Sequence, residues 1–307
     1  MSTKKEHVVS IKYARRNFSV VGLFLILYTL FVLILPFFFH MYMQYSNSPI
    51  LYDRLMYFGI YFLIIFFGTL LPFLLMRLYF RLPFRKVNRR IATSFTDLFV
   101  QTIVFFTICI ALTYVSNRIF VYFSQEGKLI SSIGFSYDDA YLDNYLYVFM
   151  LVIVTPIMEE YAFRGVLLNV LGKYGKVFGL YASAILFALA HTNFSEYIPA
   201  FAMGYVLGKT SLRYKSIRPT ILIHILFNGL IYALCVIPAP ITQYMAYGLA
   251  AVFMISVYLI LTGKYERIQI QKLRSNKTTN VIFYTCPTVI LSMLLMIAGS
   301  LLFILFK

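Results

Sequence analysis

Residues 144–171 read NYLYVFMLVIVTPIMEEYAFRGVLLNVL, an apolar stretch that nevertheless carries Glu159, Glu160 and Arg164. A stretch of this length can cross a hydrocarbon core of about 30 Å as a helix. An ionisable side chain inside such a helix costs on the order of a few kcal/mol unless it faces a partner or a water-filled cavity. The stretch therefore predicts a membrane helix that contributes to a polar functional site.

The rest of the chain is also strongly apolar. Hydrophobic residues make up 61% of its 307 residues and charged residues 12%, and the mean hydropathy is +0.81. This composition excludes an ordinary soluble domain. The formal net charge is +16, but the basic residues lie between apolar runs, so the sequence predicts no nucleic-acid partner.

Apolar runs of spanning length recur along the chain. They predict an all-α fold, a polytopic transmembrane helix bundle of about eight or nine spans. The sixth run is short and contains Pro199, which favours a tilted, broken or partly re-entrant helix. The runs lie near residues 19–43, 56–80, 95–123, 144–171, 177–194, 197–212, 217–237, 242–262 and 281–306.

Lys and Arg concentrate in alternate connections between these runs, which predicts the orientation of the chain. The N-terminal tail is basic and is expected in the cytoplasm, whereas the acidic connection after the third run is expected outside. We therefore expect a multi-pass protein of a bacterial cell membrane. Its predicted partners are the lipid bilayer and a membrane-bound protein or peptide substrate.

The two acidic residues of the quoted stretch fall on different helix faces. Glu160 and Arg164 are four residues apart, so on a helix they share a face and can form an ion pair. Glu159 is rotated by about 100° from that face, which leaves its carboxylate available as a general base. A structural alternative is a charged cluster of both acids with Arg164 and Lys173 near the cytoplasmic end.

Two histidines and an asparagine lie in later apolar runs. His191 follows Phe187 by four residues in the fifth run. His224 and Asn228 share one helix face in the seventh. Each has a structural alternative, packing for His191 and interhelical hydrogen bonding for Asn228. Together with Glu159, these residues supply a base, a water-orienting or metal-binding group and an oxyanion stabiliser, which is the inventory of a hydrolase.

The same side chains include a set of potential zinc ligands. Glu159, His191 and His224 offer one carboxylate and two imidazoles, which suits Zn²⁺. No HExxH helix is present, so three helices must converge to build such a site. These residues leave both metal-dependent and metal-independent hydrolysis open.

Three motifs follow one another in successive apolar runs: EExxxR at 159–164, FxxxH at 187–191 and HxxxN at 224–228. In order and placement they resemble the CPBP family, the CAAX-processing and bacteriocin-processing intramembrane endopeptidases. The resemblance covers about residues 144–237. The flanking runs are similar to the family only in being hydrophobic.

The resemblance implies an intramembrane endopeptidase that hydrolyses a peptide bond of a membrane-associated protein or peptide. Glu159 would activate water with the help of His191, while His224 and Asn228 would stabilise the oxyanion. The implied supporting residues are Glu160 and Arg164. The family is described as metallopeptidases, which implies Zn²⁺ on Glu159, His191 and His224, and a metal-independent glutamate mechanism is the alternative.

This interpretation divides one membrane domain into three parts. Residues 1–143 form a three-span N-terminal membrane scaffold, 144–237 a catalytic CPBP-like helix core, and 238–307 the C-terminal membrane spans. Family members cleave prenylated CAAX proteins, mature peptides or confer self-immunity to bacteriocins. The alternative is therefore a non-catalytic bacteriocin immunity or accessory membrane protein, and a proton-coupled transporter is a third hypothesis.

Overall fold

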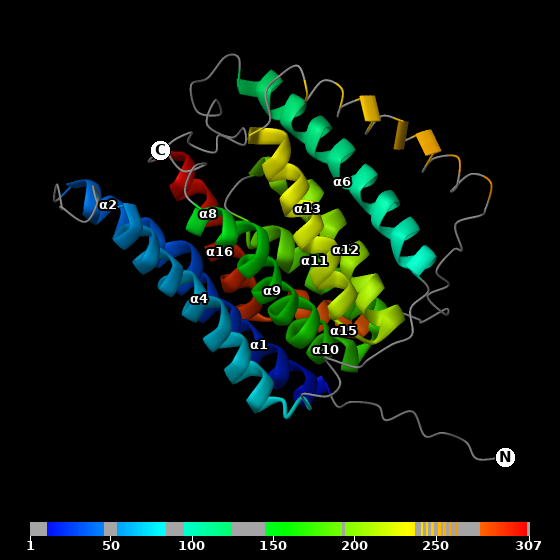
Figure 1. Cartoon of the computed structure of the whole chain (residues 1–307). Helices are drawn as coiled ribbons and strands as arrows, with labels where there is room; N and C mark the ends of the chain where they lie inside the picture. Colours follow the sequence, from blue (N-terminus) through cyan, green and yellow to red (C-terminus); the bar gives the residue numbers. More distant parts are fainter. Residues whose placement is uncertain are drawn as a thin grey trace.

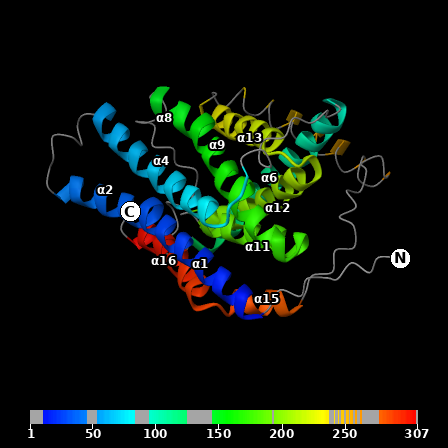
Figure 2. The same ribbon diagram turned by 90° about the horizontal axis from the view of Figure 1, so that it is seen from below.

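The computed structural model describes residues 11–45, 54–83, 95–124, 145–191, 194–236 and 277–305, with isolated positions between 241 and 262. Every element of regular structure in these ranges is a helix, as the apolar runs predicted (Figure 1). Helices α9 to α13 lie between α1 and α4 on one side and α6 on the other (Figures 1 and 2). The chemistry-bearing segments therefore occupy the centre of the bundle.

The N-terminal helices form the first side of the bundle. α1 (Ile11–Thr29), the π-helical turn η1 (Leu30–Ile34) and α2 (Leu35–Tyr45) follow one another without a break, and α4 (Arg54–Tyr79) packs beside them. On the opposite side, α6 (Phe95–Ser124) packs against α12. The first helix begins at Ile11, eight residues before the predicted start of the first run at residue 19, because the basic residues before the run are also helical.

The quoted stretch is helical throughout but not uniformly α-helical. It consists of α8 (Tyr145–Phe149), the π-helical η2 (Met150–Val154), α9 (Thr155–Glu159), the π-helical η3 (Glu160–Leu167) and α10 (Leu168–Leu171). π-helical turns are rare and are often found at functional sites. The wider turn of η3 begins at the second acidic residue, so the irregular backbone coincides with the predicted site.

Three helices complete the core. A 3-10 turn, η4 (Gly172–Tyr174), leads into α11 (Lys176–Leu189), and a second one, η5 (Phe194–Glu196), leads into α12 (Tyr197–Tyr214). α13 (Arg218–Val236) follows. Pro199 lies in the first turn of α12, where its missing N–H leaves no intrahelical hydrogen bond unmade. The sixth run is thus a single helix, not a broken one.

The last predicted run, 281–306, is not one continuous helix. It divides into α15 (Lys277–Tyr284) and α16 (Pro287–Leu305), and the two axes are bent by 58°. The break follows from Pro287, because a proline disfavours helical backbone in the residue before it. The predicted run therefore corresponds to a bent pair of helices. α16 then packs along α1.

Length and composition identify fewer spans in the described part of the chain than the sequence predicted for the whole. Ile11–Met43 and Phe62–Tyr79 are long and apolar enough to cross a membrane, and the bent pair of α15 and α16 makes a third if it counts as one span. The count of eight or nine spans is not confirmed for the described part of the chain. The predicted run 242–262 lies mostly outside that part, and the connections 84–94 and 125–144 lie wholly outside it.

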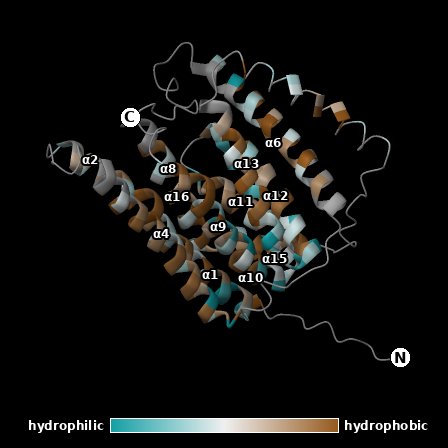
Figure 3. Ribbon diagram, in the orientation of Figure 1, coloured by the Kyte–Doolittle hydropathy of each residue, from teal (hydrophilic) through white to brown (hydrophobic). Residues whose placement is uncertain are grey.

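Apolar side chains occupy both the interior and the outer surface. Inside, the ring of Phe163 packs against Tyr28, Phe73 and Phe187 with centroid distances of 6.0, 5.5 and 5.1 Å. Outside, Phe67 is 58% exposed, and many other large apolar side chains face outward. Figure 3 shows hydrophobic residues along α1 and α4, with hydrophilic ones gathered where α1 begins near α10 and α15. Such a surface suits lipid better than water, so the fold is that of a membrane protein.

Candidate active site

A buried ion pair forms the base of the candidate site. Nη1 of Arg164 donates to Oε1 of Glu160 at 2.7 Å, and both side chains are almost fully buried. The guanidinium also lies 4.2 Å from the ring centre of Phe187 on α11, and its Nη2 donates to the carbonyl of Met203 on α12 at 3.4 Å. The predicted pairing of Glu160 with Arg164 is confirmed. The pair joins η3 to two neighbouring helices.

His224 connects the ion pair to the second carboxylate. Its Nδ1 lies 2.9 Å from Oε1 of Glu160, and its Nε2 lies 3.7 Å from Oε2 of Glu159. A carboxylate accepts hydrogen bonds, so Nδ1–H is the donor toward Glu160. That bond directs Nε2 toward Glu159, the two atoms being just beyond direct hydrogen-bonding distance.

Glu159 is the more accessible of the two acids. Its side chain is 22% exposed, whereas that of Glu160 is 0% exposed. The alternative of a charged cluster with Lys173 receives no support, because Nζ of Lys173 donates to the carbonyl of Phe80 at 3.2 Å and lies over the Phe80 ring. The two neighbouring carboxylates thus have different environments, as the 100° rotation predicted.

Phe187 brings the second histidine to the same region. The ring of His191 packs edge-on against Phe187 at a centroid distance of 4.9 Å, and His224 packs against the same ring at 6.2 Å. Nδ1 of His191 donates to the carbonyl of Phe187 at 2.9 Å, which leaves Nε2 as the outward nitrogen. One aromatic ring therefore contacts both imidazoles and the guanidinium of Arg164.

Asn228 contacts the backbone of the quoted stretch. Its Nδ2 donates to the carbonyl of Leu151 at 3.0 Å. In a π-helix that carbonyl would accept a hydrogen bond from the residue five positions later, which is Pro156 and has no N–H. Asn228 replaces the missing donor. This contact favours the interhelical role that the sequence left open, and the second amide hydrogen stays available for the predicted oxyanion role.

The three predicted zinc ligands are not gathered into a compact set. In the described part of the chain, no three His, Cys, Asp or Glu side chains lie close enough together to hold a metal ion. Glu159 and His224 face each other, whereas the ring contact of His191 is with Phe187, against which His224 also packs. The donor arrangement does not fit a tetrahedral zinc centre, and zinc binding stays a prediction.

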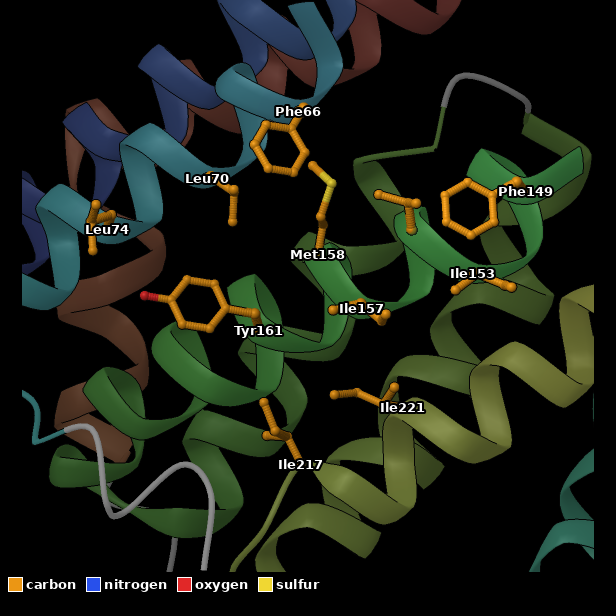
Figure 4. A pocket seen from close by; sticks show the side chains of 11 residues that line it. Phe66, Leu70, Leu74, Phe149, Ile153, Ile157, Met158, Tyr161, Ile217 and Ile221 are labelled. Carbon is orange, nitrogen blue, oxygen red and sulfur yellow. The ribbon is translucent and has the colours of Figure 1, made fainter. Parts of the chain in front are cut away.

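An apolar pocket of about 450 Å³ lies beside the helix segment that carries both glutamates. Figure 4 shows its lining side chains coming from α4 on one side and, on the other, from the segment α8 to η3 and from the start of α13 with the preceding Ile217. Met158 and Tyr161, which flank the two glutamates in sequence, both lie on its wall. The other lining residues are Phe66, Leu70, Leu74, Phe149, Ile153, Val154, Ile157, Ile217 and Ile221.

Comparisons with known proteins agree with the three motifs. Residues 141–230 match the family described as type II CAAX prenyl endopeptidase Rce1-like. A relative is the membrane-embedded CAAX protease MroQ of Staphylococcus aureus (strain USA300), 32% identical over 94 residues. That alignment covers 28% of this chain and 38% of MroQ. No solved structure matches the chain.

The matched segment, residues 141–230, contains all six predicted site residues and nearly coincides with the predicted core, 144–237. The sequence did not reveal the contacts that surround these residues. The carbonyls of Leu151 and Met203 are examples, because any residue type supplies a carbonyl. A proline in an apolar helix was a usable signal for Leu151, since each such proline leaves one carbonyl without its donor.

Proposed function

We propose that the protein is an intramembrane endopeptidase that hydrolyses a peptide bond in a membrane-associated protein or peptide. The observation that carries the proposal is the relation of Glu159 to His224. An accessible carboxylate and an imidazole nitrogen face each other across 3.7 Å, and a buried ion pair holds the imidazole from behind. The match of residues 141–230 to a family described as a type II CAAX prenyl endopeptidase supports the same reaction class.

The mechanism uses a water molecule bound between these two groups. A water that donates to Oε2 of Glu159 and contacts Nε2 of His224 would bridge their separation. Glu159 would take a proton from this water as it attacks the scissile carbonyl, and the proton would then pass to the leaving amine. Glu160 would hold His224 in one tautomer through Nδ1–H. His191 and Asn228 would complete the site as water-orienting and oxyanion-stabilising groups.

The apolar pocket offers a route for the substrate. Its wall contains almost no polar surface, and Met158 and Tyr161 connect it to the helix segment that carries both glutamates. An apolar segment or lipid group of a membrane-bound substrate would fit there without loss of hydrogen bonds. The name of the matching family, a prenyl endopeptidase, supports a lipid-modified peptide as the first probe.

The test is cleavage by the purified full chain in lipid nanodiscs. The probes are an internally quenched peptide with a farnesylated C-terminal CAAX sequence and the same peptide without the lipid. We expect cleavage by the wild type and loss of it in Glu159→Gln, which keeps the size of the side chain and removes the base. The charge-matched control Glu266→Gln, in the basic connection after residue 262, should retain cleavage. Undiminished turnover in Glu159→Gln, or no cleavage of either peptide, would contradict the proposal.

A further inference from the structure

Residues 190–196 connect α11 to α12, and His191 is the second residue of this connection. Helices cannot satisfy all their own backbone groups, since the last four carbonyls of a helix have no partner within it. In an apolar surrounding each unpaired carbonyl is costly. The donors that satisfy the carbonyls of His191 and Ser195 therefore help to fix the positions of these two residues.

Both donors come from outside the matched segment, residues 141–230. Oγ of Ser300 on α16 donates to the carbonyl of His191 at 3.0 Å, and Oγ of Ser116 on α6 donates to the carbonyl of Ser195 at 2.6 Å. Ser300 is 0% exposed and Ser116 is 1% exposed. Two buried hydroxyls, one from each flanking part of the chain, thus hold the two ends of the connection.

Ser300 is itself oriented by a residue at the start of α12. The hydroxyl of Tyr197 lies 2.7 Å from Oγ of Ser300. Ser300 has one hydroxyl proton, which is directed at the carbonyls of His191 and Met296, so Tyr197 is the donor in this pair. The chain of hydrogen bonds runs from Tyr197 through Ser300 to the backbone of His191, and it joins both ends of the connection to α16.

We propose that Ser300 is a positioning residue that places His191 in the active site, with Tyr197 and Ser116 in supporting roles. The role rests on the proposed function, because it acts through His191. Ser300 lies outside the matched segment, which ends at residue 230, but it positions a residue within that segment. Small displacements of a catalytic group lower the rate strongly, so this placement has a measurable consequence.

The first readout needs no substrate. Amide hydrogen exchange of the peptide spanning the connection is compared in purified wild type, Ser300→Ala and Ser292→Ala. Ser292 is the matched control, since it is equally buried on α16 but its Oγ donates within its own helix, to Val289. We expect faster exchange in the connection for Ser300→Ala only. Equal exchange in all three proteins would overturn the proposal whatever their activity.

The second readout is the cleavage assay. Ser300→Ala should lower kcat by about 10- to 100-fold with little change in KM, while Ser292→Ala retains wild-type kcat. In a His191→Ala background, Ser300→Ala should cause no further loss, because it acts through His191. A full additional loss in that background, or unchanged kcat in Ser300→Ala, would overturn the role.

Tyr197→Phe gives a second variant in case Ser300→Ala does not fold. It removes one hydroxyl from the same chain of hydrogen bonds and should change exchange and kcat in the same direction, by a smaller factor. If the wild type cleaves neither probe but exchange responds as expected, the placement of the His191 backbone stands and the proposed function fails. The two failures are therefore distinguishable.

Discussion

Oε1 of Glu160 accepts hydrogen bonds from two different helices, from Nδ1 of His224 at 2.9 Å and from Nη1 of Arg164 at 2.7 Å. The carboxylate is fully buried, so each donor neutralises part of a charge that water cannot reach. A histidine whose Nδ1 binds a carboxylate is fixed in orientation and tautomer. In the proposed function Glu160 is thus a supporting residue, and the reacting face of His224 is the one toward Glu159.

Arg164→Met should lower stability strongly. It keeps most of the volume of the side chain but leaves Glu160 as a buried carboxylate without its guanidinium, which costs about 3–5 kcal/mol. Unfolding of the purified protein in mixed detergent micelles measures this loss. Arg118→Met is the control, because Arg118 is exposed and should change stability by no more than about 0.5 kcal/mol. Equal losses in the two variants would contradict the importance of the buried pair.

His224→Asn should separate the roles of the two imidazole nitrogens. The amide of asparagine can take the place of Nδ1 and donate to Glu160, but nothing then faces Glu159. We expect a folded protein whose kcat is lower by about 10²-fold, because the attacking water loses the imidazole nitrogen that orients it. His224→Gln, which places its amide nearer to Nε2, should be less stable than His224→Asn. A kcat near the wild-type value in His224→Asn would remove His224 from the reaction.

The sequence predicted the parts of the site that depend on local spacing. Glu160 and Arg164 pair because four residues bring two side chains to one face, and this holds even in the wider π-helical turn. The distance from His224 to Glu159 depends on how α13 packs against α9, and no local pattern encodes it. Ser116 and Ser300 were missed for a similar reason, because serines are common in apolar helices and their partners are backbone carbonyls far away in the sequence.

The fold shows the same division between local and long-range information. The apolar runs predicted the helical class, and Pro287 carried the signal for the break between α15 and α16 that a count of apolar residues ignores. Gly204 and Gly208 of α12 have the four-residue spacing of small residues that favours a close helix contact, but this spacing does not identify the partner helix. That partner is α11, where a Cβ atom added at Gly204 would lie 2.9 Å from Cα of Ala184.

Gly204→Ala should therefore destabilise the contact between α11 and α12. The added methyl group meets backbone, which cannot rotate away, and overpacking of this kind costs about 1–3 kcal/mol. At Gly208 an added Cβ meets only the end of the Leu180 side chain, at 2.6 Å, which another rotamer can relieve. Thermal unfolding should rank Gly204→Ala clearly below Gly208→Ala. The reverse order would show that the two helices are less closely packed than the structure has them.

Asn228→Leu should affect both stability and rate, for separate reasons. It leaves the carbonyl of Leu151 unpaired in an apolar region, which costs about 1–3 kcal/mol. If the other amide hydrogen stabilises the oxyanion, kcat of the folded fraction falls as well, by about 10²–10³-fold. Unfolding and single-turnover cleavage measure the two effects independently.

Pro156→Ala in the Asn228→Leu background separates these roles. Alanine restores the backbone N–H that can donate to the Leu151 carbonyl five residues earlier, so we expect the double variant to regain stability. The oxyanion donor stays absent, so kcat should stay low. Recovery of both quantities would make Asn228 purely structural, and recovery of neither would contradict the link between Pro156 and the Leu151 carbonyl. Pro156→Ala alone is the control, since Asn228 already satisfies that carbonyl and little change is expected in either measurement.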